Sequence, residues 1–514
     1  MTGPTDRPEK IVRIDQIPPG IQRDGTRLAS ERWTDGAWVR WDGAGRFRKI
    51  GGYFAGASTI TGPVRHLRLH WQGTSGYVHS FSTTKSERFT ITAAGVMSAV
   101  SDRTPAGFTT STNNNWQSAI LYDEATGANV LLAHCTENLA DIGTGTSRPV
   151  YYGDITTTAV LITTGNSCDG GIVVLQPYAF LYNSNGLIQW SDANQPTLVG
   201  AAGGGDAGED RVTGAKIVRG FSVLDQEYVS GGGSGSVGLF WSLDSIIKAS
   251  YVGGTAIFRF QTINAEEISV LSSNAIARHA GVFYWPGIDQ FYSFTGGRVG
   301  KVPNDVNINW FFENLNYAQR QKVWNAVNER WGEIWWFFPS GSNTECDSAI
   351  VFNAHETQHT QRAVWYDVTL ARSAGDRGQN FRYPIWTDTS SPATVYFHES
   401  GVDAIDAASV SSAISSYVYT PVFTPADNGF NNWLLLKRVE HDMTQVGNVT
   451  MTVYGREYAR SSDTTEAFTV TTTTTKTDLM KQYRQMRIRF ASNAVLGNMA
   501  SGKILAHMQV GTGQ

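Results

Sequence analysis

The segment most suggestive of chemistry is His355-Glu356-Thr357-Gln358-His359, which has the His-Glu-x-x-His spacing of zinc proteases. In that motif both histidines lie on one face of a helix and share a zinc ion at a Zn–N distance of about 2 Å. The flanking sequences SAIVFN and AVWYDV are β-branched and aromatic, so they predict two strands joined by a loop. In an extended loop the two histidines would lie about 13 Å apart, at about 3.3 Å per residue. We therefore expect no metal site here.

Two glycine-rich segments, residues 203–208 and 233–238, match the Gly-x-Gly-x-x-Gly pattern of dinucleotide-binding loops. A dinucleotide site also needs a strand before the pattern and a helix after it. The first match continues into the charged GEDRV and the second into the strand-like LFWSL. In a chain with 53 glycines such matches arise from composition, so we expect no cofactor. We expect residues 201–210 and 229–238 to form mobile loops.

Acidic residues supply two further candidates. Asp206, Glu209 and Asp210 crowd one loop, but a calcium site needs more oxygen ligands at defined spacing, which favours a solvated acidic loop. Asp289 and Glu333 are candidates for the two carboxylates of a glycosidase, although nothing in the sequence pairs them. We expect a protein that is not an enzyme and that has no catalytic, metal-binding or cofactor-binding residues.

The N-terminal arm, residues 1–54, is rich in the side chains that anchor protein interfaces. Beyond a polar tip it combines turn signals with a concentration of Trp and Arg. A segment this short cannot bury so many large side chains within itself, so we expect them to pack partly against a neighbouring subunit or an adjoining protein. The alternative is that the arm closes the fold within its own chain. The candidate interface residues are Trp33, Trp38, Arg40, Trp41, Arg46 and Arg48.

Composition and hairpin spacing predict an all-β protein. Glycine supplies turns, and the 16 Trp, 20 Tyr and 24 Phe residues suit pleated surfaces. Hairpin signals such as Asn183–Gly186 recur at intervals of roughly 40 to 60 residues, as the blades of a β-propeller do. The recurrence is irregular, which leaves a sandwich open. We favour a β-propeller-like core of antiparallel blades with an extended N-terminal arm and a C-terminal β extension.

The same patterns divide the chain into three parts. The arm is followed by the propeller core over residues 55–400 and by closing strands or a small sandwich over residues 401–514. The best helical pattern lies in a short insertion near residues 304–331, where Asn316 could cap a helix from Tyr317 to Asn328.

One segment predicts a fully buried strand. Trp335-Trp336-Phe337-Phe338 is apolar on both faces, which is typical of an inner strand covered on both sides.

Charge and cysteine content narrow the class of protein. With 41 basic against 45 acidic residues the net charge is −4, which excludes a strongly cationic nucleic-acid binder. Cys135, Cys168 and Cys346 are far apart, so they form neither a disulfide framework nor a zinc cluster, and they fit folding in a reducing cytoplasm. The polar N-terminus predicts no signal peptide, and the lack of a long apolar run predicts no transmembrane segment.

Three segments carry a more specific signal: residues 18–53 in the arm, residues 301–341, and residues 363–386 with YFHESG at 396–401. Together they resemble the tail nozzle proteins of short-tailed bacteriophages, also called tail-hub or packaged-DNA-stabilisation proteins. The third segment is similar to that family's passage of a strand, Thr-Leu-Ala-Arg, a turn and Tyr-Pro-Ile. None of these motifs is catalytic, so the resemblance implies no active site.

The resemblance implies a β-propeller core and a homo-oligomeric ring, a hexamer, in the virion tail after folding in the host cytoplasm. Portal and adaptor proteins would lie above the ring, and tail fibre, spike or needle proteins beside or below it. The ring would enclose the channel through which double-stranded DNA leaves, and it would help to retain and then eject the genome without sequence-specific binding. The near-neutral charge suits such a conduit, because a cationic lumen would bind phosphates and retain the duplex.

Two other functions remain open from the sequence. A carbohydrate-binding or glycan-cleaving β-propeller for host receptor recognition would show an aromatic-walled cleft with paired acids. A minor capsid or head-decoration protein is a further alternative.

Overall fold

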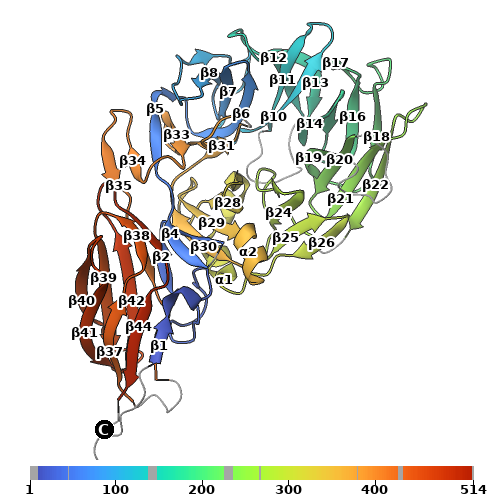
Figure 1. The fold of residues 1–514 in the computed structure, drawn as a ribbon. Coiled ribbons are helices and arrows are strands. Elements are labelled where there is room, and N and C mark those ends of the chain that lie inside the picture. Colours follow the sequence, from blue (N-terminus) through green and yellow to red (C-terminus); the bar gives the residue numbers. More distant parts are fainter. Residues whose placement is uncertain are drawn as a thin grey trace, which may run out of the picture.

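The computed structural model describes residues 10–43, 45–136, 147–224, 236–265, 268–378, 380–425 and 432–511. Nearly all of its regular structure is β, arranged as a ring of antiparallel sheets beside a separate group of sheets (Figure 1). The expected all-β, β-propeller-like fold is thus confirmed.

Six blades follow one another along the chain, each formed by four consecutive antiparallel strands. The first three blades are β6 (Val64–Gln72), β7 (Ser75–Ser82), β8 (Ser86–Thr92) and β9 (Ser101–Asp102); β10 (Asn115–Asp123), β11 (Ala128–Thr136), β12 (Arg148–Asp154) and β13 (Ile162–Cys168); and β14 (Gly171–Leu175), β15 (Tyr178–Tyr182), β16 (Leu187–Asp192) and β17 (Gln195–Val199), with β18 (Gly208–Arg211) also paired to β16.

The next three blades complete most of the ring. They are β19 (Ile217–Leu224), β20 (Ser236–Ser242), β21 (Ser245–Tyr251) and β22 (Phe258–Ala265); β23 (Ala277–His279), β24 (Val282–Pro286), β25 (Phe291–Thr295) and β26 (Arg298–Lys301); and β27 (Trp324–Asn328), β28 (Glu333–Phe338), β29 (Ser348–Asn353) and β30 (Trp365–Thr369). The first strand of a blade lies innermost, since β6, β10, β14 and β19 contact one another in turn and β23, β27, β31 and β6 continue the series.

The last blade closes the ring with a strand from the other end of the sequence. It contains β31 (Ala374–Asp376), β32 (Ile385–Thr387) and β33 (Ala393–His398), and its next strand is β5 (Tyr53–Ile60), which runs antiparallel to β33. A hairpin of β34 (Asp403–Ile405) and β35 (Ser411–Ala413) extends this sheet beyond β5. Because β5 precedes the first blade, the ring closes only when distant parts of the chain meet.

Both ends of the chain build the second group of sheets, the C-terminal sandwich. Its three sheets are β1 (Lys10–Arg13), β44 (Leu505–Val510), β37 (Leu434–Glu440) and β41 (Lys476–Tyr483); β2 (Asp35–Ala37), β36 (Ser416–Tyr419), β42 (Gln485–Ser492), β39 (Val449–Arg456) and β40 (Thr464–Val470); and β3 (Val39–Asp42), β4 (Arg46–Lys49), β43 (Asn498–Ser501) and β38 (Met443–Val446). Every sheet therefore includes a strand of the N-terminal arm (Figure 1).

Helices are few in the described residues. A 3-10 turn covers Ile14–Gln16, α1 (Ile308–Asn314) and a 3-10 helix over Tyr317–Lys322 connect the fifth and sixth blades, and α2 (Ala354–Thr360) connects β29 to β30.

The predicted helix from Tyr317 to Asn328 is wrong in its second half. The 3-10 helix ends at Lys322, and Trp324–Asn328 is strand β27, with alternate residues buried. Asn316 makes no capping hydrogen bond through its side chain. Pairing with β28 and burial of one face of Trp324–Asn328 outweigh the weak three-four spacing of the apolar residues.

Two local predictions are confirmed. Residues 335–338 lie in β28, where every side chain is buried. Asn183–Gly186 forms the turn between β15 and β16, and Gly186 has a φ of +80° at a point where an added Cβ would lie 2.0 Å from the carbonyl oxygen of Val212.

Candidate functional site

The His-Glu-x-x-His segment is a short helix, not the predicted loop. The Asn353 side chain accepts a hydrogen bond from the backbone N–H of Glu356 at 2.8 Å, and Gln361 ends α2 in a left-handed conformation. This N-cap starts a helix at a position where the strand-like flanking sequences had predicted a loop. His355 and His359 are exposed, whereas Glu356 is buried, which raises the pKa of its carboxyl group. Among the described residues, no group of three metal-ligating side chains could hold an ion.

The glycine-rich and acidic candidates take part in local structure. Residues 203–208 lead into strand β18, not a helix, so the dinucleotide-binding arrangement is missing there. Asp206 accepts a hydrogen bond from the Tyr178 hydroxyl at 2.9 Å, and Glu209 accepts one from Gln189 at 2.9 Å. Residues 229–235 of the second glycine-rich segment lie outside the described residues.

The two candidate glycosidase carboxylates have unrelated surroundings. Glu333 is fully buried and its carboxylate is engaged by Arg40, Trp335 and Tyr366. Asp289 lies exposed in the turn between β24 and β25. Since a substrate cannot reach Glu333, these two residues cannot act as a catalytic pair.

The structure buries four of the six candidate interface residues within this chain. Trp33, Trp38, Arg40 and Trp41 are between 0% and 5% exposed, and the three tryptophans belong to the core shared by the arm, the sandwich and blade six. The Arg46 and Arg48 side chains are 48% and 33% exposed and lie beside Asp42. Of the six candidate residues, Arg46 and Arg48 are therefore the two that another protein could contact.

Arg40 forms the centre of a buried polar cluster that joins the arm to the propeller. Its Nε lies 2.7 Å from Glu333, and its Nη1 donates to Glu399 at 2.9 Å. Tyr366 donates a short hydrogen bond to Glu333, and Asn328 donates one to Glu399 at 3.0 Å. Burial raises the pKa of Glu333, while the positive charge of Arg40 opposes this shift. The cluster satisfies charges that would be costly to bury alone.

A second ion-pair cluster lies beside it. Arg23 donates to Asp367 on β30 at 2.8 Å and to Asp35 on β2 at 2.5 Å. Close by, the backbone N–H of Ile21 donates to the carbonyl of Trp365 at 2.8 Å. We call these contacts, with those of Arg40, the arm–blade junction. The residues of this junction come from three parts of the chain, namely residues 18–53, residues 301–341, and residues 363–386 with 396–401.

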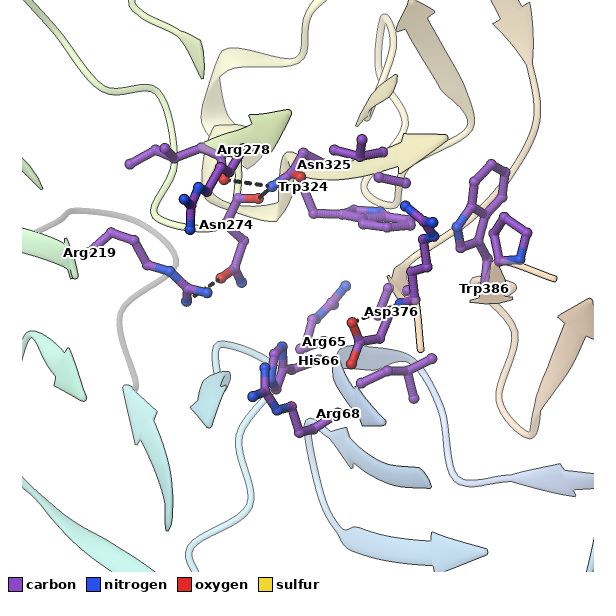
Figure 2. A pocket seen from close by; sticks show the side chains of 18 of the residues that line it. Arg65, His66, Arg68, Arg219, Asn274, Arg278, Trp324, Asn325, Asp376 and Trp386 are labelled. Atoms are coloured by element: carbon purple, nitrogen blue, oxygen red, sulfur yellow. Dashed lines mark hydrogen bonds between the residues drawn. The ribbon is translucent and has the colours of Figure 1, made fainter. Parts of the chain in front are cut away.

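A cavity of about 570 Å³ lies among the inner strands of the propeller (Figure 2). Four successive residues of β6, from Arg65 to Arg68, line it, and Leu67 also belongs with Leu69 to the apolar core between blades. Its charged lining comprises Arg65, Arg68, Arg219, Arg278, Glu329, Asp376 and Arg377. Phe221, Trp324 and Trp386 add aromatic walls.

Hydrogen bonds hold parts of this lining in place. Asn325 donates to the backbone carbonyls of Asn274 and Ile276 at 2.7 and 3.0 Å, and Arg219 donates to the Asn274 side chain at 3.3 Å. The Asp376 carboxylate accepts from the backbone N–H groups of Leu69 and Arg377 at 2.6 and 2.7 Å. The cavity thus has a positive, preorganised wall that can receive an anion.

Sequence reasoning missed this cavity. Its arginines lie on β6, β19 and β23 and directly after β31, so their spacing along the chain reflects the lengths of the blades and not a motif. The one available signal was an arginine on the first strand of the first, fourth and fifth blades, which becomes visible only when the blade boundaries are known.

Comparisons with known proteins leave the family open. The chain matches no protein-family model and is not significantly similar to any curated protein. A similar solved structure is the WD40 domain of coronin from Toxoplasma gondii, at 8% identity and a TM-score of 0.34, covering 66% of this chain and 87% of that one. In the described part of the chain, no helix is long and apolar enough to cross a membrane.

Proposed function

We propose that this chain is a structural protein of a bacteriophage tail, which forms a ring, a hexamer, around the channel through which the genome leaves. The observation that carries the proposal is the arm–blade junction. Segments far apart in the sequence that resemble tail nozzle proteins meet there in two neighbouring ion-pair clusters, in which Arg40 pairs with Glu333 and Arg23 pairs with Asp367. In this role the shared residues hold the two parts of the chain together and perform no chemistry.

The shape of the chain is consistent with a structural role. The core around Trp33 and Trp41 continues from the sandwich into blade six, where it includes Trp335 and Tyr366. A continuous core with buried ion pairs resists relative movement of propeller and sandwich. Such stiffness suits a subunit that must keep a channel open under the pressure of packaged DNA.

In this proposal the partners are further copies of the chain, portal and adaptor proteins above, and tail fibre, spike or needle proteins beside or below. Exposed Arg46 and Arg48 are the remaining candidates for contacts between neighbours. Double-stranded DNA passes through the ring without sequence-specific binding, in keeping with the net charge of −4.

The alternative, a glycan-cleaving propeller, has less support because the Glu333 carboxylate is fully buried in ion pairs. A carbohydrate-binding propeller without hydrolysis is favoured by one observation, the aromatic side chains of Trp324 and Trp386 in the cavity wall.

Cryo-electron microscopy of particles from phage that encode this chain tests the proposal. We expect six copies in a ring below the portal, and we expect Arg46→Glu with Arg48→Glu to abolish ring formation in solution. Arg298→Glu, an exposed substitution on the outer strand β26, is the control and should leave the ring intact. Particles without the chain, or rings that do not enclose DNA, would overturn the proposal.

A further inference from the structure

The cavity among the inner strands has an unbalanced charge. Five arginines line it, against the carboxylates of Glu329 and Asp376. Its volume of about 570 Å³ lies within the range of small-molecule sites, about 300 to 1,000 Å³. Figure 2 shows Arg68, Arg219 and Arg278 reaching the same space from different blades.

Two of the arginines pair with carboxylates, although Glu345 is also bound by Lys322 at 2.9 Å. Arg65 makes a bidentate pair with Glu345, at 2.6 and 2.8 Å, and Arg377 pairs with Glu329 at 2.6 Å. These ion pairs neutralise the charges of Arg65 and Arg377. The positive charge of the cavity is therefore greatest near Arg68 and Arg219.

Arg68 and Arg219 lack such partners among the described residues. Arg219 is half-buried and its polar contact is the neutral amide oxygen of Asn274 at 3.3 Å. The buried Nε of Arg68 has no hydrogen-bond partner in the described part of the chain. Burial raises the pKa of the Asp376 carboxyl group, and the nearby charge of Arg68 opposes this shift. No ion pair joins Arg68 and Asp376 in the described residues, and the Asp376 oxygens accept hydrogen bonds from backbone N–H groups.

The pKa shifts of neighbouring groups also indicate a positive electrostatic potential around these two arginines. Burial, with the charges of Arg219 and Arg68, lowers the pKa of His66 well below its usual range, and burial together with Arg68 lowers the pKa of Arg219. Two like charges held in a half-buried cavity repel each other, so an anion bound between them would be attracted by both.

We infer that this cavity binds a phosphate-bearing small molecule, with the phosphate between the guanidinium groups of Arg68 and Arg219. A carboxylate has two oxygens and is satisfied by one guanidinium fork. A phosphate monoester presents three acceptor oxygens, which lets two guanidinium groups from different blades bind it together. The aromatic rings of Trp324 and Trp386 then face the organic part of the ligand. This site is independent of the proposed place of the chain in a tail.

The test is calorimetric titration of the purified full chain with pyrophosphate, adenosine 5′-monophosphate and glucose 6-phosphate at constant ionic strength. We expect saturable binding at one site per chain for at least one of these phosphates. Arg68→Gln and Arg219→Gln, tested separately, should each weaken it by roughly tenfold or more, as expected for loss of a charged hydrogen bond. Arg298→Gln, exposed on β26, is the matched control and should bind like the original chain.

Thermal unfolding without ligand separates a binding role from a structural one. If Arg68 and Arg219 serve to bind a ligand and do not stabilise the fold, their glutamine variants should unfold at the same or a higher temperature than the original chain. The reason is that each substitution removes a repulsion between like charges. A lower unfolding temperature for both variants would overturn the inference, as would citrate or glucuronate binding as tightly as the phosphates. Absence of saturable binding, or equal loss in Arg298→Gln, would overturn it as well.

Discussion

At the residue scale, Arg40 is a fully buried cation, since it is 1% exposed and contacts two carboxylates. Removing it would leave those carboxylates without their positive partner. We expect Arg40→Met to lower the free energy of unfolding by about 3 to 5 kcal/mol, since it leaves Glu333 buried and unpaired. Urea titration followed by tryptophan fluorescence measures the change.

The matched control for this prediction is Arg438→Met. Arg438 pairs with Asp478 at 2.6 Å on the surface, where both side chains are exposed, so its loss should have little effect. Replacing Glu333 by Leu in the Arg40→Met background should recover part of the lost stability. Equal small effects of the two arginine variants would contradict the prediction.

Buried histidines predict how stability depends on pH. Burial lowers the pKa of His134 to about 4 and that of His441 to about 4, below the value of about 6.5 in an unfolded chain. Between these values the unfolded state binds more protons, so stability is retained above pH 6.5 and lost as the pH falls toward 4. For His134, which is fully buried, the loss reaches about 3 kcal/mol.

Denaturation curves between pH 7 and pH 4 measure this dependence. His134→Gln should flatten the slope of the unfolding free energy against pH, whereas His355→Gln, at an exposed position, should leave the slope unchanged. A slope that is the same in all three proteins would show that His134 does not contribute.

Although the His-Glu-x-x-His segment is helical, we still expect it not to bind zinc. His355 and His359 lie on α2, and among the described residues no third ligand lies with them. Elemental analysis of protein purified without chelator should find no stoichiometric zinc, and His355→Ala should not change the metal content. Stoichiometric zinc that is lost in His355→Ala would refute this.

At the element scale, the N-terminal arm decides whether the sandwich forms. It supplies β1, β2, β3 and β4 to the three sandwich sheets and inserts Trp33 and Trp41 into their core. We expect deletion of residues 1–54 to prevent folding, because the sheets lose strands and the core is opened to water. Circular dichroism and limited proteolysis of the truncated chain measure this.

The control for the deletion keeps the arm and changes only its exposed charges. Arg46→Ala with Arg48→Ala should fold with nearly the original melting temperature. A truncated chain that stays folded but fails to join tails would instead support the earlier expectation that the arm docks onto a partner.

At the scale of the whole molecule, the propeller and the sandwich share one core and should unfold together. The cluster that contains Trp33 and Phe490 of the sandwich also contains Trp335 and Trp386 of the propeller. We expect a single calorimetric transition, and we expect Arg23→Ala to lower its temperature without dividing it, since the apolar core remains. Two well-separated transitions in the unmodified chain would show that the parts are energetically independent.

The sequence by itself determined the class of fold and several local elements. Aromatic and β-branched runs broken by glycine turns specify antiparallel strands through short-range chemistry, so the all-β fold, the turn at Asn183–Gly186 and the buried strand at residues 335–338 were predictable. Local patterns failed at Trp324–Asn328 and at residues 354–360, where pairing with β28 and a cap from Asn353 decided the outcome.

Only the tertiary structure decided where the arm lies and what the propeller encloses. In the sequence, the Trp and Arg side chains of the arm have no visible partners nearby. Their partners, such as Glu333, Tyr366 and Phe490, come hundreds of residues later. The cavity arginines Arg68 and Arg219 are likewise separated by whole blades and meet only because the blades close into a ring. Propensity and periodicity act over a few residues, whereas ion pairing, shared burial and ring closure join residues through space, so these features had no local signature.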